Sequence, residues 1–428
     1  MILLFHRIRD VNKLLPEVKM RKVSFILILI TITIISSQAD VFFEFQPEVV
    51  DARASALGRT TVLTTSGSNT LFTNPAGLSL LKIKTLQAGM RFNFGSKTQD
   101  YESTSYPQTV NHEFSYPFHV KVNHVSYAIP VRFKDLLKNC CFAVGYRTLY
   151  DQGYNENDET EEFPGREMVT YDREYNGGFN TLTLGMGFEL MKDLRVGFSY
   201  NFGILSSNYY EKRGHFYLAT SHQMKQDYSY AGDFFSWGMI YKVNKKLDIG
   251  LTYRPVYEIE YEYKFGRRDS FYEKYYITYQ IPEQWSLSAS YSISKIWKVI
   301  LEYQPTNFVQ YEADDKMLWI SSKQGASYHV ATELNIKIPV RLGFFCSDLP
   351  NKEEYKYSTA SQDCAISPIH LIGFTAGSSW KLNDHLIMDI SAEYAYLKVE
   401  EENAYYKNST FLDRYRIGTT LTWNIESK

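Results

Sequence analysis

The histidines, cysteines and serines are the residues of this chain whose chemistry could support catalysis or metal binding. The nine histidines are scattered, and none stands at metal-ligand spacing from a cysteine or a second histidine. His112, His119 and His124 come nearest to a cluster, but we expect them to straddle a loop and a strand. The sequence has neither a Gly-x-Ser-x-Gly elbow nor a phosphate-binding glycine motif. We therefore predict that the protein is not an enzyme and uses no metal and no cofactor.

The four cysteines raise the question of a disulfide. Cys346 and Cys364 flank one predicted polar loop, whereas Cys140 and Cys141 stand where a short turn enters a predicted strand. Two states are open for the first pair: an oxidised bridge across the loop, which exported proteins often form, or two free thiols.

Charge and composition narrow the classes of partner. The chain has 46 Lys and Arg against 48 Asp and Glu, so its formal net charge is only -2. That balance gives no electrostatic reason to expect nucleic acid or an acidic substrate as a partner. Aromatic residues make up 16% of the chain, with 35 Tyr and 27 Phe. Such a content is typical of strands and of the aromatic girdles of membrane barrels.

Several segments alternate strictly between apolar and polar residues, which is the pattern of a two-faced β-strand. In residues 284–294, every even position from 286 to 292 is serine, while the odd positions are Trp, Leu, Ala, Tyr and Ile. Residues 194–203, 386–397 and 414–424 repeat this alternation. In a membrane barrel the apolar face contacts lipid and the other faces the lumen. We therefore expect an arginine to impair assembly at Leu287 and to be tolerated at Ser288.

The connections between strands favour a membrane barrel over a secreted β-sandwich, which would also alternate. We predict fourteen strands, centred near Met90, Val125, Tyr146, Leu184, Phe198, Trp237, Leu251, Ala289, Leu301, Thr332, Gly343, Phe374, Ile390 and Thr419. Short turns follow the even strands, at 134–139, 192–193, 243–246, 294–296, 336–338 and 382–384. Long polar loops follow the odd strands, at 96–118, 155–176, 206–227, 264–275, 310–326, 347–368 and 399–413. An even number of strands, with short turns at one end and long loops at the other, predicts an all-β, transmembrane antiparallel barrel of the bacterial outer membrane.

An apolar leader precedes the strands. Lys19, Arg21 and Lys22 give it a basic start, residues 23–35 an apolar core, and residues 37–39 a small-x-small cleavage site. We predict a signal peptide region over residues 1–39, in which 1–19 is an over-extended start. A retained anchor helix is the alternative. Residues 40–82 would form an N-terminal hatch and residues 83–428 the barrel.

The polar face of the predicted strands carries many charges, and on the lipid face each would cost about 2–4 kcal/mol at mid-bilayer. We predict a lumenal position for Arg91, Arg147, Arg195, Arg254, Arg341, Arg414, Arg416, Asp248, Glu302, Asp389 and Glu393. Two roles are open for them: ion pairs that fill and stiffen the barrel, or a site for the headgroup of a ligand.

Eight strands leave an interior that side chains fill and 16–18 leave an open channel, so a barrel of fourteen strands has a lumen that a plug would need to close. The stretch before the first strand is the right size for such a hatch. Its motifs are Ala-Arg-Ala-Ser-Ala-Leu-Gly at 52–58, Ser-Gly-Ser-Asn-Thr-Leu-Phe at 66–72 and Asn-Pro-Ala-Gly-Leu at 74–78. They resemble the hatch of the FadL-type outer-membrane proteins, a superfamily that includes hydrocarbon channels and PorV-like proteins. The chain departs from that pattern at Arg59-Thr60-Thr61, where members usually carry a further glycine.

The resemblance implies a plugged fourteen-stranded barrel that takes up small hydrophobic molecules, such as long-chain fatty acids, by passive transfer. It implies a gate at the turn 74–77, with Leu71 and Phe72 as apolar contacts and Arg53 as an anchor to lumenal carboxylates. The hatch residues concerned are Arg53, Leu57, Leu71, Phe72, Asn74, Pro75, Ala76 and Gly77. The alternative is a PorV-like scaffold that holds secreted or surface partners. Membrane lipid is a partner in both hypotheses.

Overall fold

The computed structural model describes residues 49–425 with internal gaps. The gaps are residue 65 and residues 104–108, 132–137, 152–153, 162–167, 216–219, 268–269, 307–309, 314–318, 321–324, 350–355, 358–359, 362–364, 367–368 and 403–405. The predicted signal peptide region therefore lies outside the described residues, as does the start of the predicted hatch.

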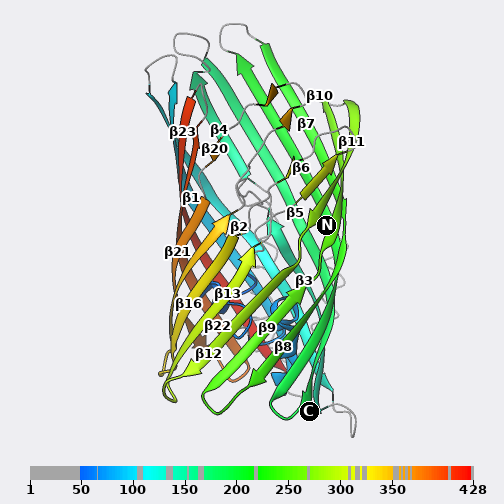
Figure 1. Ribbon diagram of the computed structural model, residues 1–428, viewed down its shortest axis with the longest axis vertical. Helices are drawn as coiled ribbons and strands as arrows, with labels where there is room; N and C mark the ends of the chain where they lie inside the picture. Colours follow the sequence, from blue (N-terminus) through cyan, green and yellow to red (C-terminus); the bar gives the residue numbers. More distant parts are fainter. Residues whose placement is uncertain are drawn as a thin grey trace, which may run out of the picture.

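Fourteen antiparallel strands form one closed barrel (Figure 1). They are β1 Lys84–Ser103, β2 Thr109–Val131, β3 Lys138–Asp151, β5 Met168–Met191, β6 Leu194–His215, β8 Asp233–Lys242, β9 Leu247–Arg254, β12 Gln284–Ser292, β13 Trp297–Thr306, β16 Gly325–Leu334, β17 Val340–Leu349, β21 Ile369–Lys381, β22 Leu386–Glu402 and β23 Tyr406–Ile425. The barrel closes because β1 pairs with β23 from Lys84↔Ile425 to Ser103↔Tyr406. Each of the fourteen predicted strand centres falls within one of these strands, so the strand assignment is confirmed.

The connections at the long-loop end differ from the prediction. The predicted loop at 206–227 is mostly paired strand, since β6 pairs with β7 (Thr220–Ala231) as far as His215↔Thr220. The predicted loop at 96–118 likewise continues β1 and β2 up to Glu102↔Thr109. A barrel strand needs only about 9–11 residues to span a membrane, whereas β5 has 24 and β2 has 23. The pairing therefore runs far beyond the membrane, on polar sequence that we had interpreted as loop.

Shorter strands extend the wall at the same end. They are β4 Tyr154–Glu161, β10 Tyr257–Arg267, β11 Ser270–Ile281, β14 Gln310–Ala313, β15 Trp319–Ile320 and β20 Ala365–Ile366, with β18 Lys356–Tyr357 and β19 Ala360–Ser361 as a separate pair. By contrast, the described turns at the opposite end are as brief as predicted, for example the two residues between β5 and β6.

The outer face of the barrel is apolar. On β12, Leu287 is 46% exposed and Ser288 only 1%, as the alternation predicts. Aromatic side chains cluster on this outer face, where Tyr415 packs against Phe94 and Tyr394 with ring centroids 5.5 and 5.1 Å apart. An apolar belt bounded by aromatic rings is the surface that a barrel presents to lipid, so the protein spans the outer membrane. In the described residues, no helix has the length and apolar character that crossing a membrane requires.

The N-terminal segment, residues 49–83, contributes three short helices: α3 Ala52–Ala56, α4 Thr70–Thr73 and the 3-10 helix η2 Pro75–Leu80. Asp51 caps α3 by accepting a hydrogen bond from the Ala54 N–H, and Asn74 caps η2 in the same way through the Ala76 N–H. Pro75 at the first position of η2 suits that start because it has no N–H to satisfy. These helices lie inside the half of the barrel nearest the short turns (Figure 1).

The parity of β12 can be tested with two arginine substitutions. Leu287→Arg places a charge in lipid and should lower the free energy of unfolding by about 2–4 kcal/mol. Ser288→Arg, which alternation alone predicts to be tolerated, should also fail to assemble, because Ser288 is buried and its hydroxyl donates to the Leu301 carbonyl. Heat-modifiable gel mobility would report folding, with Leu287→Met as the control. Normal folding of Leu287→Arg would contradict the assignment of this face to lipid.

Candidate functional site

The candidate site is the N-terminal segment, residues 49–83, together with the lumenal side chains that hold it; we call this segment the plug. Its helices pack against both halves of the barrel, because α3 contacts β21, β22 and β23 while η2 contacts β3, β5, β6 and β8. The plug backbone therefore enters a closed space in which each polar group needs a partner from the wall.

One anchor is the ion pair between Arg59 and Glu393 on β22. The guanidinium donates through both Nε and a terminal nitrogen, at 3.0 and 2.8 Å from the two carboxylate oxygens. Arg414 and Arg416, on the neighbouring strand β23, approach the same carboxylate at 3.3 and 3.8 Å. The Arg59 guanidinium also lies 4.5 Å from the centroid of the Phe345 ring. A buried bidentate pair of this kind fixes the orientation of the plug as well as its position.

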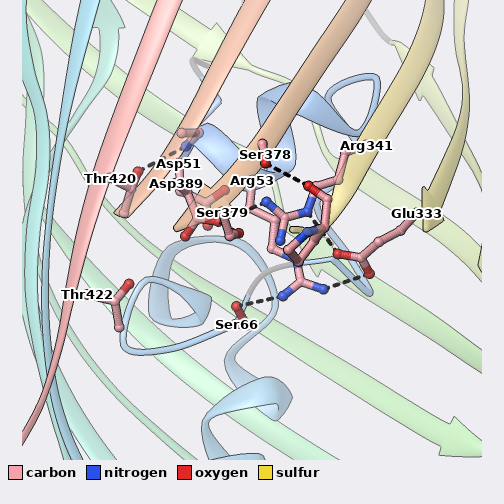
Figure 2. Close-up of polar contacts among 12 residues, drawn as sticks. Asp51, Arg53, Ser66, Glu333, Arg341, Ser378, Ser379, Asp389, Thr420 and Thr422 are labelled. Atoms are coloured by element: carbon pink, nitrogen blue, oxygen red, sulfur yellow. Dashed lines mark hydrogen bonds and ion pairs between the residues drawn. The ribbon is translucent and has the colours of Figure 1, made fainter. Parts of the chain in front are cut away.

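A second anchor joins the plug to three strands. Arg53 on α3 lies between Ser66 and Glu333, and its guanidinium is 2.9 Å from the Glu333 carboxylate (Figure 2). Glu333 on β16 also accepts from Arg341 on β17 at 2.8 Å, and Arg341 reaches Asp389 on β22 at 2.8 Å. The charges alternate along this chain, so each buried ion has an opposite partner.

Hydrogen bonds to the plug backbone complete the attachment. Glu302 on β13 accepts from the N–H groups of Thr61 and Val62 at 2.9 and 3.0 Å and from the Thr61 hydroxyl at 3.0 Å. His329 Nδ1 lies 2.7 Å from the Gly58 carbonyl oxygen, and Thr375 accepts from the Gly58 N–H at 2.9 Å. Lumenal side chains of three different strands, β13, β16 and β21, thus bind the plug backbone at residues 58, 61 and 62.

The predicted gate residues lie in the other half of the plug. Leu71 and Phe72 are buried in an apolar cluster with Val50, Leu78, Ala128, Cys141 and Ala143. Arg147 on β3 donates to the Phe72 carbonyl at 3.0 Å, and its guanidinium lies 5.4 Å from the centroid of the Phe72 ring. Asn74 donates to the Val62 carbonyl at 3.0 Å. Leu57 packs separately, against Ile300 and Ala331.

Glycines of the wall let the plug backbone approach. A Cβ atom added at Gly187 or Gly197 would overlap Pro75 and one added at Gly343 would overlap the backbone of Gly58. Gly58 itself has φ +63, a conformation that favours glycine. The same close approach recurs at Gly145, Gly185, Gly238, Gly250 and Gly377. Together these positions form a glycine bed on seven of the fourteen barrel strands.

Packing is looser on the remaining side. At Gly418 on β23 the nearest plug atoms would lie 3.6 Å from an added Cβ, which is ordinary contact. A small cavity lies there, lined by the start of the plug and by Met90, Arg91, Asn123, Glu393, Arg416, Gly418, Thr419 and Thr420. The Ala52 N–H donates to Thr420 across this side at 3.0 Å (Figure 2). Asp51 lines the same cavity, and burial raises the pKa of its carboxyl to about 6 against the opposing effect of its hydrogen bonds.

Directly beyond the plug, toward the long strands, the lumen becomes apolar. On three strands, the residue two positions beyond a lumenal residue at the level of the plug, toward the long-strand end, is apolar. These residues are Leu149 after Arg147 on β3, Phe345 after Gly343 on β17, and Leu412 before Arg414 on β23. We call this set the apolar layer; all of its members are buried. It comprises Leu149, Phe179, Phe234, Tyr257, Ile281, Phe345, Leu371, Leu397 and Leu412.

The remaining predicted residues are not gathered at the plug. Arg195 is half-buried near the short-turn end of β6, opposite Glu189 in register, and Asp248 is half-buried on β9. Arg254 lies over the Phe234 ring, 4.9 Å from its centroid. Cys346 is half-buried on β17, while Cys364 lies outside the described residues, so their pairing stays a prediction.

Sequence reasoning missed several residues that join the plug to the wall. Arg59 and Thr61 had appeared only as departures from a family motif, yet they bind Glu393 and Glu302. Glu333 was predictable, because alternation along β16 places it on the same lumenal face as His329. The wall glycines carried no signal of their own, because nothing local distinguishes a glycine that faces the plug.

Within the described part of the chain, no group of three or more His, Cys, Asp or Glu side chains could hold a metal ion. The arrangement is suited to holding a folded segment inside a barrel and to presenting an apolar lumen above it.

Comparisons with known proteins agree with this architecture. A FadL homologue of Pseudomonas aeruginosa aligns with a TM-score of 0.63 at 9% identity, over 90% of this chain and 100% of its own. The toluene transporter TodX of Pseudomonas putida aligns with a TM-score of 0.58 at 11% identity, over 89% and 100%. TbuX, the toluene transporter of Ralstonia pickettii, gives 0.52 at 12%, over 90% and 100%. At such identities the likeness is one of fold: the chain has the fold of the FadL-type barrels.

The sequence comparison is more specific. Residues 49–338 match the BamG family, so the chain belongs to that family. The matched region begins with the plug and ends in the turn after β16. No curated protein matches the sequence significantly.

The Arg59–Glu393 anchor can be tested by truncation. Arg59→Ala removes the bidentate hydrogen bonds to the Glu393 carboxylate, which keeps Arg414 and Arg416 nearby, and should lower the free energy of unfolding by about 1.5–3 kcal/mol. Arg195→Ala, which removes a half-buried arginine away from the plug, should stay within about 0.5 kcal/mol of the parent protein. Denaturant unfolding of the refolded barrel in liposomes measures both. Equal effects of the two changes would refute the anchor.

The glycine bed makes a separate prediction. Gly343→Ala forces a Cβ into the Gly58 backbone, whereas Gly418→Ala meets the plug at ordinary contact distance and crowds only the hydroxyl oxygen of Ser391 on the neighbouring strand. We expect limited proteolysis to cleave the plug at least several-fold faster in Gly343→Ala than in Gly418→Ala. If the plug were equally protected in both variants, the tight seat would not exist.

Proposed function

We propose that this protein is a passive channel for small hydrophobic molecules. They enter at the long-strand end, occupy the apolar layer above the plug and leave sideways into the membrane. The observation that carries this proposal is the apolar layer itself, since inward-facing Leu, Ile and Phe side chains give an apolar ligand a favourable place inside an otherwise polar lumen. No chemical step is needed, because a concentration gradient drives the transfer.

A break in the wall supports the sideways exit. Pairing between β2 and β3 ends at His124↔Arg147, although β2 begins fifteen residues earlier in the chain, at Thr109, and β3 continues to Asp151. Over these described residues no backbone pair joins the two strands beyond that point. Leu149 of the apolar layer lies on β3 within the break, and the Phe72 ring is 6.2 Å from that of His124.

The close packing of the plug against the wall also supports a sideways exit. The family resemblance implies either movement of the hatch or a lateral gap in the wall. Moving the turn 74–77 would break the close approach of Pro75 to Gly187 and Gly197 and the contacts of Asn74. We therefore propose that molecules pass beside Phe72 and that the turn acts as the floor of the path. Long-chain fatty acids and monoaromatic hydrocarbons are the two ligand classes that we propose to compare.

A scaffold for secreted or surface partners is the second candidate. The buried ion pairs and the seated plug favour it, because a scaffold needs a filled lumen and no path through it. The long paired strands beyond the membrane would then serve as the surface that partners contact.

An uptake assay separates the two candidates. Phe179→Ser should reduce entry of a fluorescent fatty acid or of toluene roughly tenfold, because it removes one buried aromatic side chain from the path. Phe202→Ser changes an outward-facing residue and serves as the matched control. Cells that produce equal amounts of folded protein are compared, and whichever ligand is affected identifies its class. Unchanged uptake of both ligands in Phe179→Ser would reject the channel, and co-purification of a surface protein would then favour the scaffold.

A further inference from the structure

The rim of the barrel at the short-turn end carries an unusual set of side chains. Five described turns join β5 to β6, β8 to β9, β12 to β13, β16 to β17 and β21 to β22, and each has a lysine and an exposed apolar residue within it or directly before it. We call these turns the basic rim. Their lysines are Lys192, Lys245, Lys246, Lys295, Lys337 and Lys381, and their aliphatic residues are Met191, Val243, Ile296, Ile336, Ile338 and Leu382.

The charge of the basic rim is one-sided. Its turns contain five lysines, with Lys381 directly before the fifth turn, and only two acidic residues, Asp193 and Asp384, although the whole chain carries a formal charge of -2. Lys381 is paired with Asp384 at 3.0 Å. The described structure gives the other five lysines no carboxylate partner, and all five are exposed. A cluster of unpaired ammonium groups of this kind attracts an anionic surface.

The basic rim is also ordered and continuous. Asn244 and Asn383 accept backbone hydrogen bonds within their own turns, for example from Lys246 N–H at 2.8 Å. Neighbouring turns are joined to one another: the Asn335 N–H donates to the Ile296 carbonyl at 2.7 Å, and the Ser292 N–H donates to the Lys246 carbonyl at 2.8 Å. The lysines are therefore presented from fixed positions along an arc.

The height of the basic rim identifies what it meets. Trp297 and Trp380 face outward immediately next to these turns, and outward tryptophans mark the level of lipid headgroups. Ile296 is 52% exposed and Ile336 53%, and both continue the apolar belt that already contacts lipid. Lysine beside aliphatic residues at this level suits the membrane boundary, since the apolar parts enter the interface while the ammonium groups stay at the phosphates.

The short turns of outer-membrane barrels face the periplasm. From this position and charge we propose that the basic rim binds the headgroups of anionic phospholipids in the periplasmic leaflet. This goes beyond the proposed channel and does not depend on it. The apolar side chains of the basic rim are continuous with the lipid-facing belt, which favours lipid as the partner. An acidic periplasmic protein would instead need lysines that point away from the membrane. Each lysine near an anionic surface strengthens the attraction by roughly fivefold.

The test uses the full-length folded protein in detergent, titrated with phosphatidylglycerol or phosphatidylcholine and followed by native mass spectrometry. The variant K245Q/K246Q/K295Q/K337Q should bind phosphatidylglycerol at least tenfold more weakly than the parent, with binding of phosphatidylcholine unchanged. The matched variant K245R/K246R/K295R/K337R keeps the charge and should bind as the parent does. K398Q, which removes a lysine already paired with Glu400, should also have no effect.

Heat-modifiable gel mobility confirms that each variant is folded before titration. Equal retention of phosphatidylglycerol by the parent and the glutamine variant would overturn the proposal. It would also be overturned if the glutamine variant lost a co-purifying acidic protein while its lipid binding stayed unchanged, because the rim would then serve a protein. Loss of phosphatidylglycerol binding in the glutamine variant, with retention in the arginine variant, would establish the lipid site.

Discussion

The interior of a fourteen-stranded barrel has to be filled, and the rest of this structure depends on how the chain meets that constraint. The wall alone is too wide for its own side chains to close. The plug fills the space, but it brings unpaired backbone groups and arginines into a buried setting where each needs a partner. Glu302, Glu333 and Glu393 supply these partners from three different strands. The lumenal carboxylates are thus explained by the segment they hold.

The wall was predictable because lipid imposes its pattern on the sequence. Alternation of Trp285, Leu287 and Ala289 with serines fixes both the strand and its orientation, and the same rule located all fourteen strands. Where the strands leave the membrane, that rule no longer applies, because no lipid selects an apolar face there and the sequence of β7, which pairs with β6, is largely polar. Their pairing beyond Ser206↔Ser229 was therefore interpreted as loop. Alternation therefore predicts the strands only over the part of the barrel that lipid surrounds.

The lumenal contacts were harder to predict for a different reason. The plug has no period, so nothing local shows that Arg59 turns toward a carboxylate 334 positions away in the sequence. The Arg53 anchor was suggested by a resemblance and does contact a lumenal carboxylate, but Glu333 was not among the charges named for it. Such partners follow from where strands far apart in sequence meet around a closed wall, which depends on register and not on residue type.

The distribution of contacts around the plug bears on how the barrel works. On the sides of β5, β6 and β17 the plug backbone rests on glycines, so any displacement opens empty space against a rigid wall. On the side of β1 and β23 it is held by hydrogen bonds such as Ala52 to Thr420, next to a small polar cavity. Water can replace a hydrogen bond there at little net cost, whereas nothing replaces close packing. On the proposed route, a plug held in this way stays seated and keeps its half of the lumen closed, while an apolar molecule leaves through the break between β2 and β3.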